Sequence, residues 1–147
     1  RDDVESRGLG DVYKRQLENV AIEKACARMT EEEMRRLWLA AKEFEHTIAE
    51  GNLVKLAEAD VAFHEVIYQA SDNKRLIQVL NNMREQIYRY RVEYLKREEA
   101  HPQLIAEHAA IIEYISKGEK KAATDIMCKH IDNQVTTVID VIRTKQN

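Results

Sequence analysis

Apolar residues recur at steps of three and four along almost the whole chain, which is the spacing of one face of an α-helix. The stretch between Thr30 and Gly51 is typical of this pattern. Its apolar face consists of Met34, Leu37, Trp38, Ala41, Phe44 and Ile48. No segment shows the alternation of a half-buried β-strand, so the sequence predicts an all-α fold.

Turn-forming residues divide this pattern into separate helices. Gly51 and Gly118 fall where the periodicity breaks, as residues that end a helix do, and Pro102 can stand in the first turn of a new helix. Thr30 and Glu33 have the spacing of a capping box at a helix start. The predicted helices cover about 17–25, 30–48, 53–70, 75–97, 103–117 and 119–142, with breaks near 51, 73, 101 and 118. Short turns between them predict an antiparallel bundle of about six helices around a central pocket.

The first 16 residues do not share this pattern. The run from Asp11 to Gln16 resembles a translated transposon end of the kind used in preparing sequencing libraries. We therefore expect residues 1–16 to be a non-native leader that contributes nothing to folding, and residues 17–147 to form the domain. The alternative is a disordered native tail.

Length, charge and cysteines narrow the class of protein. The chain has 147 residues, enough for one domain with a real core. Its 23 basic and 26 acidic residues give a net charge of -3, which argues against DNA binding by this segment alone. No apolar run approaches the roughly 20 residues of a membrane-spanning helix, and no export signal precedes the pattern. Cys26 and Cys128 lie far apart in the sequence, so we expect no disulfide framework, which fits a reducing compartment. Together these features predict a cytoplasmic protein without membrane association.

Four ionisable residues occupy positions where the helical pattern calls for core residues. Asp60 and His64, four apart, interrupt the apolar face of the third predicted helix. His108 and His130 lie on the inner faces of the last two predicted helices, about 15 and about 18 Å from a turn at Gly118. A lone carboxylate in a core is strongly unfavourable, whereas imidazoles and a carboxylate that converge on a cation satisfy one another.

The sequence therefore predicts a divalent transition metal at these four residues, with zinc, nickel or manganese as candidates. Two other metal sites do not fit. A ferritin-like di-iron site needs paired Glu-x-x-His motifs together with further glutamates, and Glu43 to His46, which has this spacing, lies off the inner face. A zinc protease needs the motif His-Glu-x-x-His, but the run that begins with His64 and Glu65 has Tyr68 at the position of the second His. A buried polar network without metal is the alternative, and a metal assay separates the two.

The fourth predicted helix adds positive charge near the expected site. Between residues 74 and 97 there are seven basic residues and two acidic ones. Arg84 and Arg91, seven apart, border one side of its apolar face, where a guanidinium could pair with a carboxylate. A six-coordinate metal with four protein ligands keeps two positions for a chelating acid. We therefore predict a small organic acid as effector, with Arg84 and Arg91 as its partners; a solvated basic face is the alternative.

Four segments together form a recognisable combination: Asp60–His64, Ala70–Asn73, Glu107–His108 and His130. They resemble the FCD domain of the FadR branch of GntR-type transcription regulators. The Leu17–Glu18 pair fits the family's first helix, so the resemblance covers about residues 17–138. It implies a helical bundle that binds metal through an Asp and three His and takes a small organic acid as effector. The winged helix-turn-helix domain that normally precedes it is absent from this sequence.

These observations predict a ligand-sensing domain of a bacterial GntR-type regulator. We expect a homodimer, with operator DNA bound only through the absent N-terminal domain. The alternative is a metal-dependent, hydrolase-like enzyme, since an open metal with these ligands could activate water. Glu65 and Glu107 are each one residue out of phase with a neighbouring ligand, so no general base is expected on the inner face. This disfavours catalysis, and we predict that the protein is not an enzyme.

Overall fold

The computed structural model describes residues 16–130, 132 and 133, and this part of the chain is helical without any strand. The described helical segments are residues 16–28, α2 (Glu31–Glu50), α3 (Leu53–Ala70), α4 (Lys74–Asn82), α5 (Arg84–Leu95), the short 3₁₀ helix η1 (Glu98–Ala100), α6 (His101–Ser116), residues 120–130 and residues 132–133. The predicted all-α fold is confirmed. The segment up to residue 15 and most of the last predicted helix lie outside the described residues.

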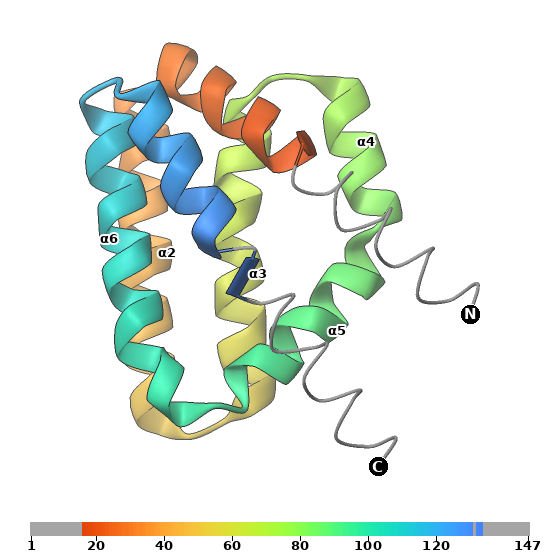
Figure 1. The fold of residues 1–147 in the computed structure, drawn as a ribbon, viewed down its shortest axis with the longest axis vertical. Coiled ribbons are helices and arrows are strands. Elements are labelled where there is room, and N and C mark those ends of the chain that lie inside the picture. Colours follow the sequence, from red (N-terminus) through yellow and green to blue (C-terminus); the bar gives the residue numbers. More distant parts are fainter. Residues whose placement is uncertain (1–15, 131, 134–147) are drawn as a thin grey trace.

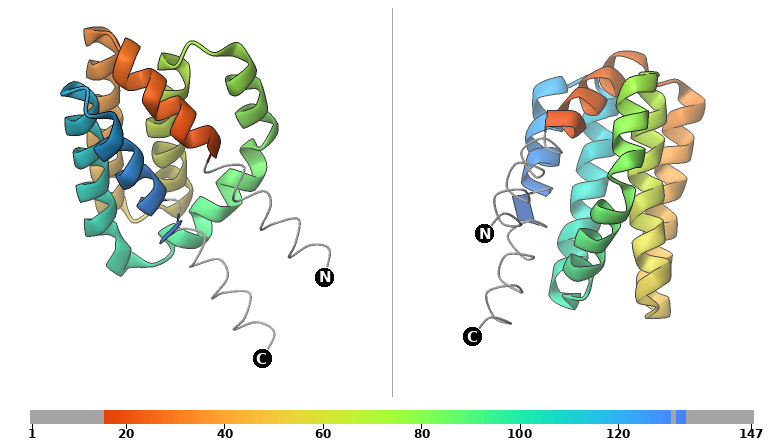
Figure 2. Two further views of the ribbon diagram at one scale, coloured as in Figure 1. Left: turned by 45° about the horizontal axis from the view of Figure 1, so that its top comes forward. Right: turned by 90° about the vertical axis from the view of Figure 1, so that its right-hand side faces the viewer.

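The bundle is built around α2, α3 and α6. Figure 1 shows these three helices along the long axis of the molecule, with residues 16–28 lying across one end. α2 packs against both α3 and α6, and α3 also packs against α5. Figure 2 shows the same bundle from two further sides. No described helix is long and apolar enough to cross a membrane.

Local sequence signals account for the helix ends. The Thr30 hydroxyl accepts a hydrogen bond from the Glu33 amide, and the Glu33 carboxylate accepts one from the Thr30 amide, which is the predicted capping box. Gly51 and Gly118 end their helices with positive φ of 71° and 69°, a conformation that costs glycine little. The breaks predicted near residues 51, 73, 101 and 118 are all present.

The fourth predicted helix differs from the expectation, because it is two helices. The backbone leaves the helical region at Met83, with φ −96° and ψ 3°, so α4 ends and α5 begins there. Asn81 and Asn82, which are weak helix formers, precede this break. The apolar spacing continues across it, and for this reason periodicity alone did not reveal it. The break lets the second half of α5 turn toward α3, where Arg91 and Tyr94 are buried.

Candidate metal centre

The bundle brings the four predicted ligands together in its interior. Asp60 and His64 come from α3, His108 from α6 and His130 from the helix that begins at residue 120. Each of the four is at most 1% exposed. One potential ligand atom from each residue lies within 4.8 Å of the other three. The geometry therefore agrees with the convergence that the helical spacing predicted.

The distances suit a single ion. His64 Nε2 lies 3.3 Å from His130 Nε2, and His108 Nε2 lies 3.1 Å from Asp60 Oδ1. His64 Nε2 is 3.7 Å from the same Asp60 oxygen. Atoms bound to one ion at about 2.1 Å are about 3 Å apart when adjacent and about 4 Å apart when opposite. The four side chains can thus serve as ligands without a large rearrangement.

Aromatic side chains hold the imidazole of His108 in place. The Phe63 ring stacks on it with centroids 4.1 Å apart, and Phe44 meets it edge-on at 4.7 Å. Both phenylalanines are fully buried. Rigid packing of this kind fixes the direction of the ring nitrogens before any ligand binds.

Two glutamates lie behind the histidines. Glu107 Oε1 is 3.3 Å from His130 Nδ1, and Glu18 Oε2 is 3.9 Å from His64 Nδ1. A carboxylate in this position favours the proton on Nδ1 and leaves the Nε2 lone pair free for a metal. The expectation that Glu107 would miss the inner face was wrong. Its side chain is 4% exposed and is long enough to reach His130 from the neighbouring position.

Electrostatics favour forms of Asp60, His64 and His108 that can coordinate a metal. Burial alone would raise the pKa of Asp60, but the hydrogen bond with His108 and the positive charge of Arg91 outweigh it, so that pKa is well below normal. Burial and the charge of Arg91 lower the pKa of His64 well below its ordinary value. Burial also lowers the pKa of His108, against the opposing hydrogen bond with Asp60. An ionised carboxylate beside neutral imidazoles is the state that coordinates a metal.

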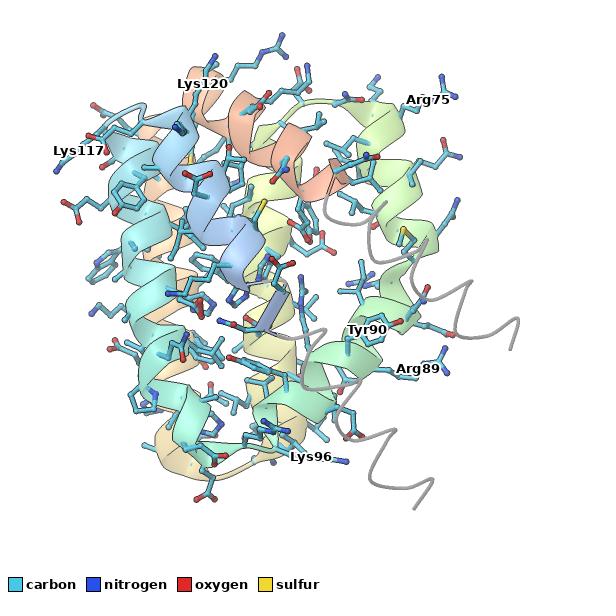
Figure 3. The ribbon with its side chains drawn as sticks, viewed as in Figure 1. Arg75, Arg89, Tyr90, Lys96, Lys117 and Lys120 are labelled. Carbon is cyan, nitrogen blue, oxygen red and sulfur yellow. The ribbon has the colours of Figure 1, made fainter. Side chains whose placement is uncertain are left out.

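The two arginines predicted as effector partners lie in different places. Arg91 is 1% exposed, and its Nε is 3.4 Å from Asp60 Oδ2. The side chain of Arg84 is 64% exposed and pairs with Glu65 at 3.8 Å. Figure 3 shows other basic side chains pointing outward in the same way, among them those of Arg75, Arg89 and Lys96. Arg91 is therefore beside the cluster and Arg84 is on the surface.

Sequence reasoning missed two residues of the cluster. The Tyr68 hydroxyl donates a hydrogen bond to Glu18 Oε1 and accepts one from Arg91 at 3.3 Å. Tyr68 follows His64 by four residues, so its helical phase could have revealed it. Glu18 is completely buried, but the short first helix gave no clear inner face from which to predict this.

The cluster contains buried polar atoms that have no hydrogen-bond partner among the described residues. They are Glu18 Oε2, Asp60 Oδ2, His64 Nδ1, Arg91 Nε, Glu107 Oε2 and His108 Nδ1. Such atoms are rare in folded proteins and are costly in an apolar interior. Their concentration here fits a site that takes a cation and a polar ligand, and the residues present therefore suit a bound metal.

The fold and the cluster define an all-helical domain with a buried group of carboxylate and imidazole side chains in its interior. A family model described as the FCD domain matches residues 12–133. This chain belongs to the FCD family, the effector-sensing domains of GntR-type transcription regulators, and is therefore a regulatory domain and not an enzyme. The match begins at residue 12, within the segment 1–16 that is predicted to be a non-native leader, and that assignment stays a prediction.

A solved structure has the same fold. The chain is similar to E. coli McbR/YncC, with a TM-score of 0.79 and 11% sequence identity. The similarity covers 88% of this chain and 66% of that one, so this chain spans less than two thirds of that protein. At such low identity the likeness concerns the fold alone. No curated protein sequence matches the chain.

Proposed function

We propose that this domain senses a small carboxylate metabolite at a bound divalent transition metal. The observation that carries the proposal is the pair of imidazole Nε2 atoms of His64 and His130, 3.3 Å apart and fully enclosed. Glu18 and Glu107 lie near the opposite nitrogens of these rings. If both rings carry their proton on Nδ1, two lone pairs face each other, and a cation between them removes the repulsion.

The proposed ligands are Asp60, His64, His108 and His130, with zinc, nickel or manganese as the metal. The donor set of imidazoles and one carboxylate suits these ions. Bound there, the metal would act as a Lewis acid that attracts an anionic ligand. The chain itself supplies the ionised Asp60, neutral His64 and His108, and an interior in which each of the four side chains is at most 1% exposed.

The proposed effector is a small organic acid that binds next to this metal. Arg91 supports this choice, because a buried guanidinium 3.4 Å from the Asp60 carboxylate is available for a charged hydrogen bond to a second carboxylate. The effector role of Arg84 and the central pocket stay predictions. The variant Arg84→Ala tests separately whether this surface guanidinium contributes to effector affinity.

We further propose that the protein acts in the cytoplasm as a homodimer. A DNA-binding domain that precedes this segment in the complete regulator would contact operator DNA. This segment alone has a net charge of -3, so we expect no sequence-specific DNA affinity from it. A mobility-shift titration at physiological salt tests that expectation, and nanomolar, sequence-selective binding would contradict it.

The metal proposal is tested by metal analysis of the chain purified without chelator and reloaded with zinc, nickel or manganese. We expect one ion per chain, and its loss in His64→Ala and His130→Ala. The matched control is His46→Ala, because His46 lies on the surface of α2 and pairs with Glu50. Retention of metal by both site variants, or its absence from the wild type, would leave only a buried polar network.

The effector proposal is tested by calorimetry with hydroxy acids, dicarboxylates and sugar acids on metal-loaded and metal-stripped protein. We expect binding only to the loaded form, and a loss of at least tenfold in affinity for Arg91→Ala. A ligand that binds equally well to stripped protein, or that ignores both Arg91→Ala and Arg84→Ala, would defeat this part of the proposal.

A further inference from the structure

Glu18 carries a carboxylate into the centre of the domain from the helix of residues 16–28. Its side chain is 0% exposed. The Tyr68 hydroxyl donates to its Oε1, and the guanidinium of Arg91 lies 3.7 Å from the same oxygen. Its second oxygen has no hydrogen-bond partner among the described residues and points toward His64 Nδ1 at 3.9 Å. A charged group is rarely buried in this way unless it is paired.

Arg91 lies between two carboxylates with different roles. Asp60, 3.4 Å from its Nε, belongs to the proposed metal ligands. Glu18 does not belong to that set, and its carboxylate is held instead by Arg91 and Tyr68. These are the contacts that a free carboxylate would need beside the metal: a guanidinium, a hydroxyl and a neighbouring cation site. Glu18 thus has the position and the chemistry of a carboxylate ligand.

We propose that Glu18 is a built-in carboxylate that occupies the anion site of Arg91 and Tyr68 in the effector-free domain, and that the effector binds by displacing it. This inference rests on the proposed function, because it assumes that a carboxylate effector binds at the metal. Two carboxylates cannot share these donors at such distances without strong repulsion. Effector affinity is therefore lowered by the free energy of the Glu18 contacts.

Displacement of Glu18 loosens residues 16–20 of its helix and leaves the later residues in place. Ala21, Ile22 and Ala25 are fully buried in the core and keep the rest of the helix in place. Residues 16–20 are held by Glu18, by Leu17, which packs against the core, and by Asn19, whose Oδ1 accepts a hydrogen bond from the Cys128 thiol at 3.1 Å.

The test compares carboxylate affinity in variants of Glu18 at full metal loading. The probes are malonate, L-malate and D-gluconate, titrated calorimetrically into the metal-loaded chain. Glu18→Gln removes the competing charge, and we expect at least one probe to bind tenfold or more tightly than to the wild type. Glu18→Asp keeps the charge but withdraws it by one methylene, and we expect a gain of at least threefold. Glu23→Gln, an exposed position on the same helix, controls for net charge and should stay within twofold.

A second measurement follows the helix itself by hydrogen–deuterium exchange. We expect the probe that binds to speed exchange in residues 16–20 of the wild type, and to have little effect in Glu18→Gln, where exchange is already fast. If Glu18→Gln does not fold, Glu18→Asp and the wild-type exchange decide the matter.

The outcomes separate the two proposals. Metal-dependent probe binding that is equal in the wild type and both Glu18 variants would overturn this inference alone, as would slower or unchanged exchange in the wild type. Failure of the wild type and both variants to bind any probe would overturn carboxylate sensing and this inference together.

Discussion

Acidification should destabilise the metal-free domain in a pH window set by its buried histidines. The pKa values of His64 and His108 are lower in the folded domain than the ordinary value of 6.5. Below pH 6.5 the unfolded chain therefore binds protons that the folded chain does not, and the free energy of unfolding falls as pH falls. The pKa of Asp60 is lowered, so its contribution is lost only at much more acid pH, outside this window.

The magnitude follows from proton linkage. Between pH 7.5 and 5.5, a histidine that stays neutral in the folded state lowers the free energy of unfolding by about 1.4 kcal/mol. His64 alone gives this value, and a complete contribution from His108 brings the total to about 2.8 kcal/mol. Since the shift of His108 is the smaller one, we expect a loss between these limits.

The assay is urea unfolding of the chain in EDTA at pH 7.5, 6.5 and 5.5, followed by circular dichroism. His64→Gln should reduce the loss by about 1.4 kcal/mol, because it removes one titrating group from the core. A free energy of unfolding that stays level or increases between pH 6.5 and 5.5 would refute the reasoning, since it would mean that these imidazoles accept protons in the folded domain.

Three substitutions test the supports of the site and the fold. Glu107→Gln should weaken metal binding about 10- to 100-fold in a chelator competition, because it removes the carboxylate behind His130. The control is Glu113→Gln at an exposed position of the same helix, which should leave metal affinity unchanged. Phe63→Leu should lower the free energy of unfolding by about 1–2 kcal/mol in urea titrations and weaken metal binding, because the ring stacked on the imidazole is lost. Thr30→Ala should cost about 1 kcal/mol and lower Tm by a few degrees without affecting metal binding, because it removes a helix cap far from the site. The first prediction would be contradicted by equal metal affinity in both glutamate variants. The second would be contradicted by an unchanged free energy of unfolding and metal affinity for Phe63→Leu, and the third by an unchanged Tm for Thr30→Ala.

The four proposed metal ligands could be predicted because helical spacing fixes which residues share a face. Asp60 and His64 stand one turn apart on α3, and an antiparallel turn at Gly118 brings His108 level with His130. These relations depend only on the helical repeat and on the hairpin, both of which can be read from sequence.

Other features depend on lengths and angles that periodicity does not contain. The break at Met83 is invisible in the apolar spacing, and it changes the direction of α5. Arg84 and Arg91 share a helical face, but only the second half of α5 is close enough to α3 to bury its side chain. Glu107 lies one position before the inward-facing His108, and its side chain is long enough to reach His130 from there.

The central claim, a metal held by Asp60, His64, His108 and His130, is tested most directly by anomalous X-ray diffraction from crystals of the nickel-loaded chain. The account predicts one strong anomalous peak inside the bundle, about 2.1 Å from an imidazole nitrogen of each of the three histidines and from an Asp60 oxygen. A peak bound by other residues, or the absence of an anomalous peak at this cluster in fully loaded crystals, would contradict it.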